Sequence, residues 1–167
     1  GAVKISGAKN AVLPVMAAVL LAPGKYSIEN VPDLRDTRTM MKLLNIIGAK
    51  TIFDKGSLTI DSSSANNPEA PYDLVKTMRA SFYVLGPLIS RFGRVNVSLP
   101  GGCAWGPRPV DYHLKGLEQL GAKLNLDGGN ILAEAKEVIG NDIHFEFPSV
   151  GATGNLAMAA VKASGTT

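Results

Sequence analysis

Residues 36–61, DTRTMMKLLNIIGAKTIFDKGSLTID, contain the pattern that decides the fold. Over residues 36–47 apolar side chains recur three and four positions apart, which predicts an amphipathic helix, and Gly48 supplies its C-terminal stop. Two short strands are predicted next, at 51–54 and 57–61, and the Lys55-Gly56 pair between them favours a hairpin turn. This stretch therefore predicts a helix followed by a β-hairpin.

The residues before this stretch complete a longer unit. A strand is predicted at 3–6, a helix at 10–21 and a strand at 26–31, with Pro23-Gly24 ending the helix. Pro14 is compatible with that helix because it falls near the first turn, where few amides have helical partners. The order is thus strand, helix, strand, helix, strand, strand.

The same order returns after a connector at 62–71 that is rich in Ser, Asn and Pro. We predict a helix at 72–92, a strand at 94–99, a glycine-rich loop, a helix at 110–120 and a hairpin at 123–135 that turns at Gly128-Gly129. The triplet GAK at 48–50 recurs 73 residues later at 121–123. At that offset the apolar positions of the first helix recur in the second, with Met41, Leu44 and Ile47 replaced by Leu114, Leu117 and Leu120.

A third copy begins late in the sequence. Gly151-Ala152 lies 144 residues after Gly7-Ala8, about twice the period, and each pair precedes an Ala-rich apolar helix. Gly-Ala pairs are common, so chance is the alternative explanation, but several landmarks agree on one period. We therefore expect repeats over about 1–62 and about 70–136 and an incomplete third over about 142–167, which would make the chain most of one domain of a longer protein.

The composition is that of a globular domain with a small excess of positive charge. The chain has 167 residues, of which 46% are hydrophobic and 19% charged, and its formal net charge is +3. Anionic ligands are compatible with this charge, whereas the lack of Lys/Arg blocks gives little support to nucleic-acid binding. One cysteine excludes a disulfide framework and a multi-cysteine zinc site, and with two histidines no metal is expected.

An apolar run at 11–22, preceded by Lys4 and Lys9, has the outline of a signal peptide. Its twelve residues are too few to span a bilayer, which takes roughly 20. No initiator Met stands before the run and no convincing cleavage site follows it, so we favour a buried helix of the mature protein. The expectation is a cytoplasmic protein with no membrane partner.

Residues 99–113, LPGGCAWGPRPVDYH, are the most informative about chemistry. Glycines and prolines place Cys103 on a loop between a strand and a helix, where backbone amides and the helix N-terminus could face an anion. Arg108 could share that pocket, because a guanidinium binds phosphate or carboxylate with two hydrogen bonds. The alternative is a small buried hydrophobic residue in a turn, and the residues alone leave both interpretations open. His113 and Asp111 fall on different helix faces, so local spacing does not indicate a Cys-His pair.

Three further segments could contact an anionic ligand. Lys9 and Asn10 lie at a strand-to-helix junction, where free amides accompany a cation. Arg79 lies in a predicted helix and is ambiguous alone. The segment PSVGAT at 148–153 repeats the strand-to-helix turn of the first unit and could supply another contact to an anion or a sugar.

Together these segments closely resemble the UDP-N-acetylglucosamine 1-carboxyvinyltransferases of the enolpyruvyl transferase family, over essentially the whole chain. The resemblance is carried by SGAKN at 6–10, APYDLVKTMRAS at 70–81, LPGGC at 99–103, RPVDYH at 108–113 and SVGAT at 149–153. It implies an α/β fold, an inside-out α/β barrel built from repeated βαβαββ units in two domains. About two and a half units would be present here.

The resemblance also implies an activity. Members transfer the enolpyruvyl group of phosphoenolpyruvate to the 3-hydroxyl of UDP-N-acetylglucosamine and release phosphate, the first committed step of peptidoglycan precursor synthesis, without metal or organic cofactor. Cys103 would be catalytic, as proton donor to the methylene carbon of phosphoenolpyruvate, and would be the target of the epoxide inhibitor fosfomycin. Binding of phosphoenolpyruvate falls to Lys9, Asn10 and Arg108. Binding of UDP-N-acetylglucosamine falls to Asn10, Arg79, Arg108, Pro109, Val110, Asp111, Tyr112, Pro148, Ser149 and Val150.

One position departs from the family pattern, since Phe147 stands where many members carry Lys. Members place the aspartate that deprotonates the sugar, and further arginines, in a second domain. We therefore expect the second domain of the same polypeptide as partner, and no turnover by these 167 residues alone. The alternatives are a non-catalytic sugar-nucleotide-binding module, against which Lys9, Cys103 and Arg108 argue, and 5-enolpyruvylshikimate-3-phosphate synthase, which shares the fold but lacks this cysteine loop.

Overall fold

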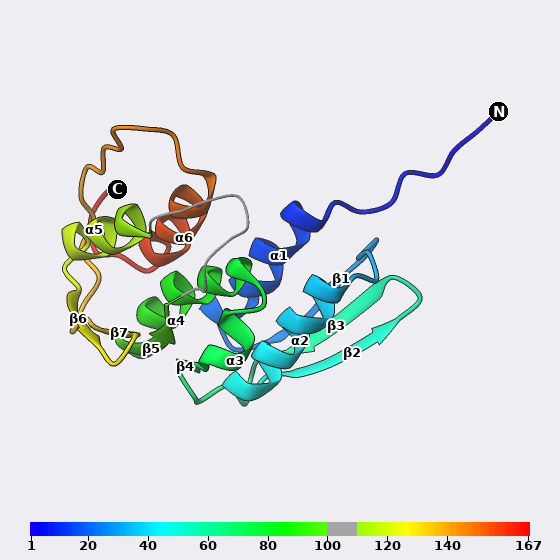
Figure 1. The fold of residues 1–167 in the computed structure, drawn as a ribbon, viewed down its shortest axis with the longest axis horizontal. Helices are drawn as coiled ribbons and strands as arrows, with labels where there is room; N and C mark the ends of the chain where they lie inside the picture. The colour runs from blue at the N-terminus through cyan, green and yellow to red at the C-terminus, as the bar shows by residue number, and fades with distance from the viewer. Residues whose placement is uncertain (100–109) are drawn as a thin grey trace.

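The computed structural model describes residues 1–99 and 110–167, and in them helices flank β-sheets (Figure 1). The first part contains, in chain order, α1 (Lys9–Ala18), the 3-10 helix η1 (Val19–Leu21), β1 (Lys25–Ile28), α2 (Arg35–Ile47), β2 (Lys50–Asp54) and β3 (Ser57–Asp61). The second contains β4 (Glu69–Ala70), α3 (Tyr72–Val75), the 3-10 helix η2 (Arg79–Val84), α4 (Leu85–Phe92), β5 (Arg94–Ser98), α5 (Asp111–Gln119), β6 (Lys123–Asp127), β7 (Asn130–Glu134) and α6 (Val150–Ala160). This alternation confirms the predicted α/β class.

The described strands form sheets that share one plan. In the first sheet the order is β1-β3-β2 and every pair is antiparallel. In the second the order is β4-β5-β7-β6, where β5, β7 and β6 repeat that antiparallel arrangement and β4 adds a parallel edge strand. A parallel bridge between Ile139 and Ser164, on either side of α6, resembles the β4–β5 pairing. The chain therefore builds the same strand arrangement at least twice.

The predicted hairpins and the predicted helix stop at Gly48 are confirmed in detail. Both residues of each hairpin turn have positive φ, 45° and 88° at Lys55-Gly56 and 54° and 82° at Gly128-Gly129. This is the type I′ geometry that matches the twist of the flanking strands. Gly48, with φ of 102°, and Gly121, with φ of 90°, end the two equivalent helices in the left-handed conformation that favours glycine.

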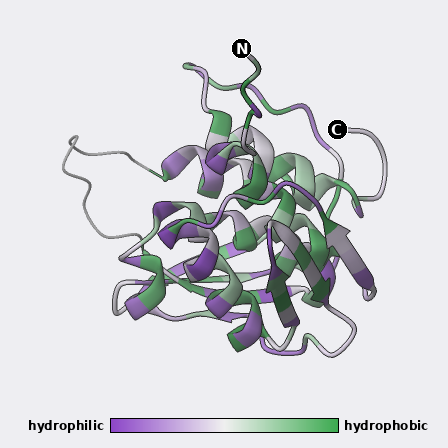
Figure 2. Ribbon diagram, turned by 90° about the vertical axis from the view of Figure 1, so that its right-hand side faces the viewer, coloured by the Kyte–Doolittle hydropathy of each residue, from purple (hydrophilic) through white to green (hydrophobic). Residues whose placement is uncertain are grey.

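The core lies between the helices and the inner faces of the sheets. α4 packs against α6, α5 covers α6, and α1 packs against α2. The helices at the left of Figure 2 carry hydrophobic and hydrophilic residues side by side, as expected of helices with one face towards the core. Fully buried side chains include Met16, Leu20, Met40, Leu43, Leu44, Leu85 and Leu88. Among the described helices, none is long and apolar enough to cross a membrane.

The strand predicted at residues 3–6 is wrong. Residues 1–8 have no regular secondary structure, residues 1–6 extend from the body as a tail (Figure 1), and Val3 is 84% exposed. A strand persists only where a neighbour pairs with its N–H and C=O groups. β4 has such a neighbour in β5, whereas residues 3–6 pair with none of the described strands.

The helix predicted over 72–92 is wrong as a single helix. α3 ends at Val75, η2 begins at Arg79, and Met78 between them has an extended backbone with φ −148° and ψ 102°. Pro87 lies nine residues after this break and does not cause it, but it falls in the first turn of α4, where its missing N–H costs no helical hydrogen bond. It is the third residue of α4, so that helix has to begin close to where it does.

Candidate functional site

A cleft of about 350 Å³ opens where the first turns of α1, α2, α5 and α6 meet the broken segment before α4. The N-terminal turn of a helix has free N–H groups and a partial positive charge, so this convergence favours an anionic ligand. The cleft is lined by Lys9, Asn10, Leu13, Asp36, Thr77, Met78, Arg79, Ala80, Phe82, Tyr83, Val110, His113 and Gly151.

An ion pair joins the starts of α1 and α2 at this cleft. Lys9 Nζ lies 2.9 Å from Asp36 Oδ2, and the lysine side chain is 47% exposed. The ammonium is therefore held near the cleft and is still open to solvent. A bound phosphate or carboxylate could compete with Asp36 for it.

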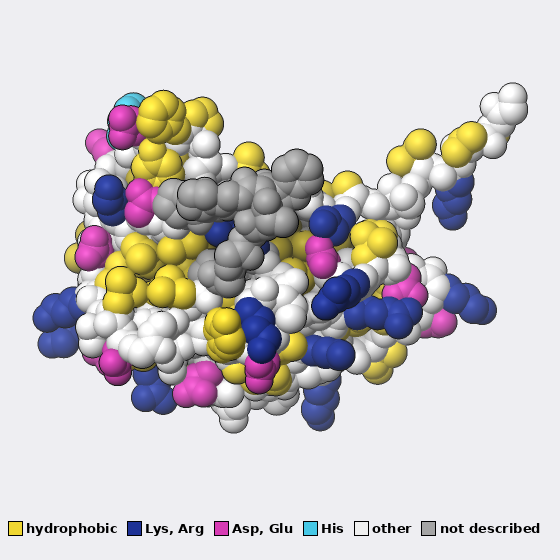
Figure 3. All heavy atoms as spheres, viewed as in Figure 1, with side chains coloured by type: hydrophobic (Ala, Val, Ile, Leu, Met, Phe, Trp, Pro, Cys, Tyr) yellow, Lys and Arg dark blue, Asp and Glu magenta, His cyan; other side chains and the backbone are white. Residues whose placement is uncertain are grey.

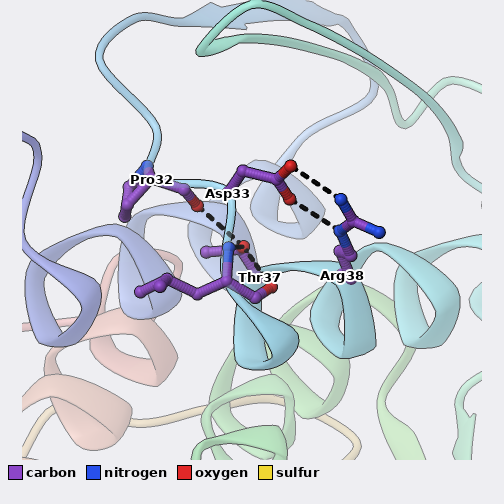
Figure 4. Close-up of polar contacts among 5 residues, drawn as sticks. Pro32, Asp33, Thr37 and Arg38 are labelled. Atoms are coloured by element: carbon purple, nitrogen blue, oxygen red, sulfur yellow. Dashed lines mark hydrogen bonds and ion pairs between the residues drawn. The ribbon is translucent and has the colours of Figure 1, made fainter.

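The start of α2 is fixed by its own side chains (Figure 4). Thr37 Oγ1 accepts a hydrogen bond from the Leu34 amide at 3.0 Å and donates to the Pro32 carbonyl at 2.8 Å. Arg38 donates from Nε and Nη2 to the two carboxylate oxygens of Asp33, each at 2.6 Å, and this hydrogen bonding lowers the pKa of Asp33. These contacts set the first turn, and with it the position of Asp36.

The break between α3 and η2 supplies the other cation. The backbone is extended at Met78, and Thr77, Met78 and Arg79 all border the cleft. Arg79 lies close enough to His113 for its charge to lower the pKa of that histidine. The cleft thus holds Lys9 and Arg79 on different elements.

Figure 3 shows further Lys and Arg side chains gathered over α2, right of centre. Arg35, Arg38 and Lys42 line a separate surface hollow there. Arg38 is paired with Asp33 there, whereas Arg35 and Lys42 add to the positive potential on this side of the molecule, which steers anions towards it.

Asn155, on α6, is fully buried and joins three other elements. Its Oδ1 accepts a hydrogen bond from the Gly86 amide at 2.6 Å, and its Nδ2 donates to the Phe82 carbonyl at 3.1 Å. These partners fix the orientation of the amide, because an N–H requires an oxygen and a carbonyl requires an N–H. Nδ2 also lies 2.9 Å from Nδ1 of His113, so Nδ1 accepts and Nε2 carries the proton of the neutral ring.

Glycines on both neighbouring helices let α6 approach this closely. A Cβ on Gly86 would lie 2.1 Å from the carbonyl oxygen of Asn155, and one on Gly116 would lie 2.1 Å from Leu156 Cδ1. Any larger residue would push α4 or α5 away from α6. The glycines therefore bring Asn155 within hydrogen-bonding distance of its partners.

His113 is neutral in this environment. It is 8% exposed, and its ring meets that of Phe82 edge-on with centroids 4.9 Å apart. Burial, and after it the charge of Arg79, lower the pKa of His113 from 6.5 to about 4, although Asp111 acts in the opposite direction. The imidazole is therefore a neutral hydrogen-bonding group at pH 7.

Four residues assigned to substrates from separate sequence segments, Lys9, Asn10, Arg79 and Val110, line the one cleft. Cys103, Arg108 and Pro109 lie outside the described residues. The other assigned residues lie around the first turns of α5 and α6 and do not line the cleft; they are Asp111, Tyr112, Pro148, Ser149 and Val150.

Asp111 and Tyr112 occupy the first turn of α5. Asp111 Oδ1 is buried without a hydrogen-bond partner among the described residues, and its other oxygen is 3.9 Å from Lys115 Nζ. The Tyr112 hydroxyl accepts a hydrogen bond from the Phe147 amide at 3.3 Å, and its ring is tilted over that of Phe145 at 5.3 Å. The tyrosine therefore ties α5 to the segment before α6.

The segment 148–150 leads into α6. Ser149 caps that helix by accepting a hydrogen bond from the Ala152 amide at 3.3 Å. Pro148 and Val150 are exposed, and the next residue, Gly151, borders the cleft. This segment thus lies beside the cleft.

The sequence predictions missed Asp36, Thr77, Met78, Tyr83 and His113 as cleft residues. One signal for His113 was present. At the 73-residue offset of the repeat it replaces Met40, so a polar residue stands where the first repeat buries an apolar one. The described residues contain no group of three or more His, Cys, Asp and Glu side chains suited to a metal ion.

A family model described as EPSP synthase (3-phosphoshikimate 1-carboxyvinyltransferase) matches residues 1–167. UDP-N-acetylglucosamine 1-carboxyvinyltransferase from Chloroherpeton thalassium is 55% identical over 170 residues, and its namesake from Desulfosudis oleivorans is 53% identical over 167 residues. Both comparisons cover all of this chain and 40% of the relative. The chain thus spans about 40% of the length of these curated relatives.

Solved structures share the fold. The enolpyruvyl transferase NikO from Streptomyces tendae has a TM-score of 0.80 and 24% identity, and EPSP synthase from Acinetobacter baumannii has a TM-score of 0.73 and 16% identity. Both cover 99% of this chain and 39% of the other. The predicted enolpyruvyl transferase-like fold is confirmed. Because the family model and the fold agree along its whole length, the chain belongs to the EPSP synthase family of enolpyruvyl transferases, and its sequence resembles the UDP-N-acetylglucosamine 1-carboxyvinyltransferases within it.

Proposed function

We propose that the complete polypeptide transfers the enolpyruvyl group of phosphoenolpyruvate to the 3-hydroxyl of UDP-N-acetylglucosamine and releases inorganic phosphate. The observation that carries the proposal is the convergence of Lys9, Asn10, Arg79 and Val110 in a cleft bordered by helix N-termini. Relatives bearing this activity in their names are 50–55% identical to the chain. The proposal concerns the whole protein, because the chain spans about 40% of their length.

The reaction is an addition followed by an elimination. In the first step the 3-hydroxyl oxygen bonds to C2 of phosphoenolpyruvate, the hydroxyl proton passes to a base, and C3 gains a proton. In the second step C3 loses a proton, the bond from C2 to the phosphate oxygen breaks, and phosphate leaves. Charge builds on the leaving phosphate, so cations placed beforehand, such as Lys9 and Arg79, stabilise the second transition state.

Some of these roles fall on the segment at residues 100–109, and the others fall on residues of the cleft. We assign proton donation to C3 to Cys103 and phosphate binding to Arg108, on the strength of the sequence resemblance. Lys9 would bind phosphoenolpyruvate after exchanging Asp36 for a substrate oxygen, which the exposure of the pair permits. The helix N-termini around the cleft would add partial positive charge towards both anionic substrates.

The test measures phosphate release by the complete polypeptide, with phosphoenolpyruvate and either UDP-N-acetylglucosamine or shikimate 3-phosphate as acceptor. We expect phosphate release when UDP-N-acetylglucosamine is the acceptor and none when shikimate 3-phosphate is the acceptor. Release with shikimate 3-phosphate instead would overturn the proposed acceptor, and binding of the sugar nucleotide without release would point to a binding module. The 167-residue chain by itself should give no turnover.

A lysine pair provides a matched control for the cleft. Lys9→Met should lower kcat/KM about 100-fold or more, because it removes a charge from the substrate site. Lys136→Met removes an exposed lysine that does not line the cleft and should leave kcat/KM unchanged. Equal effects of the two substitutions would contradict the role of Lys9.

A further inference from the structure

His113 directs one ring nitrogen towards the cleft. Its Nδ1 is occupied by Asn155 in the core. The opposite edge of the ring lies against Gly151, since a Cβ on that glycine would be 3.4 Å from Nε2 and 3.5 Å from Cε1. Both His113 and Gly151 line the cleft, so Nε2 faces the space that a ligand would occupy.

Asn155 determines what this nitrogen can do. Because the Gly86 amide and the Phe82 carbonyl fix the orientation of the Asn155 side chain, Nδ1 of His113 has to accept and Nε2 has to carry the proton. Within residues 1–99 and 110–167, Nε2 donates to no protein acceptor. Nε2 is also not among the buried atoms that lack a partner in the described part of the chain, so it reaches solvent at the cleft, where an oxygen of a bound ligand could take the place of water.

We propose that His113 contacts the substrate as a neutral Nε2–H donor to a phosphate or carboxylate oxygen bound beside Lys9 and Arg79, and that Asn155 positions it. The inference rests on the proposed function for the identity of the ligand, phosphoenolpyruvate or UDP-N-acetylglucosamine. Lys9 and Arg79 already supply cations at the cleft, with Asp36 opposite. A neutral donor adds a directed hydrogen bond there without further charge repulsion.

Packing alone does not require a polar ring at this position. In the first repeat the equivalent residue is Met40, which is fully buried and apolar. α5 could therefore be packed with an apolar side chain, as α2 is. The second repeat instead has a histidine here, which lines the cleft, and its buried amide partner Asn155 comes from α6, in the third repeat.

The first test compares two substitutions at one position in the complete polypeptide. His113→Gln keeps an N–H donor at about the place of Nε2, and His113→Leu removes it. Loss of a hydrogen bond to a charged acceptor should lower kcat/KM about ten- to a hundred-fold in His113→Leu, whereas His113→Gln should stay within about threefold of the wild type. The substrate whose KM rises in His113→Leu is the one that supplies the oxygen bound by Nε2. Equal values for His113→Leu and the wild type, or an equal loss in both variants, would overturn the proposal.

A spectroscopic test reports on Asn155 and the ring without turnover. With 15N-labelled histidine, we expect NMR to show Nδ1 unprotonated and Nε2 protonated from pH 5.5 to pH 8, with Arg79 and Asp111 as the charged groups that act on the ring. Asn155→Asp would place a carboxylate beside Nδ1, move the proton there and raise the pKa of His113. A ring that carries its proton on Nδ1, or that titrates in this range in the wild type, would refute the role of Asn155.

The two proposals fail in different ways. If the wild type releases no phosphate from the proposed substrates, the proposed function fails, while the NMR result still decides the state of the ring. If the wild type is active and His113→Leu is equally active, only the role of His113 is lost. Circular dichroism and urea unfolding of each variant distinguish a lost contact from a lost fold.

Discussion

The two helix-hairpin units, α2 with β2 and β3 and α5 with β6 and β7, share a backbone plan and differ in what the helices bury. Their strands pair in the same antiparallel arrangement, 73 residues apart. At that offset Met40 and Leu43 of α2, both fully buried, become His113 and Gly116 in α5. α2 fills the core with apolar side chains at these positions. α5 has a glycine that allows α6 to pack closely, and a histidine ring.

The difference shows where function departs from the repeat. Gly116 lets Leu156 and its neighbour Asn155 come close to α5, and Asn155 then holds His113 at the cleft. The shared residues are those of the turns and apolar stripes, which any copy needs in order to fold. Of the two buried positions that differ, His113 borders the candidate site, and Gly116 makes room for α6, which carries the Asn155 partner of that ring.

The largest change in stability should come from placing Ala at the equivalent positions 43 of α2 and 116 of α5. Leu43→Ala leaves a cavity in the first unit and should lower the free energy of unfolding by about 2–5 kcal/mol. Gly116→Ala should lower it by about 2 kcal/mol for the opposite reason, because the new Cβ would meet Leu156 Cδ1 at 2.1 Å, which outweighs the gain in helix propensity. Urea unfolding of the variants measures both changes.

A second substitution distinguishes the clash at Gly116 from the cavity at Leu43. Adding Leu156→Ala to Gly116→Ala removes the atoms that clash, so the combined loss should be smaller than the sum of the single losses. Leu156→Ala combined with Leu43→Ala should be close to additive. A neutral Gly116→Ala would show that α5 does not depend on close contact with α6.

The next effect concerns acid stability and the pair Met40 and His113. The pKa of His113 is about 4 in the folded protein against 6.5 for an unperturbed ring, so the unfolded chain takes up a proton that the folded protein does not. Stability should therefore fall as the pH drops from 6.5 to 4, by on the order of 3 kcal/mol from this group, and the contribution should level off below 4. Arg79 and Asp111 are the charged groups that act on the ring.

His113→Met gives the second unit the residue of the first and should remove this pH dependence. Unfolding free energies from urea titrations of the wild type and the variant are compared between pH 7 and pH 4. Carboxylates titrate in both proteins and cancel in the difference. Parallel curves for the two proteins would contradict a buried neutral histidine.

Local patterns predicted the elements whose cause is local. The apolar spacing over α2, the stop at Gly48 and the turn at Lys55-Gly56 depend on a few neighbouring residues, and the structure agrees with all three. The predicted strand at 3–6 failed because a strand needs a partner, which no short segment specifies. The predicted helix at 72–92 failed because the chain breaks between Val75 and Arg79, a stretch that contains no Gly or Pro to mark the break in the sequence.

The candidate site divides in the same way. Motifs identified Lys9 and Arg79 because their segments resemble a known family, and the structure places both at one cleft. Asp36 could not be identified, because its ion pair with Lys9 depends on how α1 packs on α2. His113 depends on Asn155, 42 residues away, and on the glycines that let their helices meet.

The smallest effect compares the glycines that end α2 and α5. Both have positive φ, 102° at Gly48 and 90° at Gly121, so replacement by Ala should cost about 1 kcal/mol at either site. Gly48 has a further constraint, because a Cβ there would lie 3.0 Å from the Ser64 carbonyl oxygen, against 3.5 Å from that of Glu137 at Gly121. Gly48→Ala should therefore be the more destabilising variant in urea unfolding. Equal losses would mean that the connector after β3 yields to the new methyl group, and a larger loss at Gly121 would mean that the second unit, with the cleft-forming helix, is the more tightly constrained of the two.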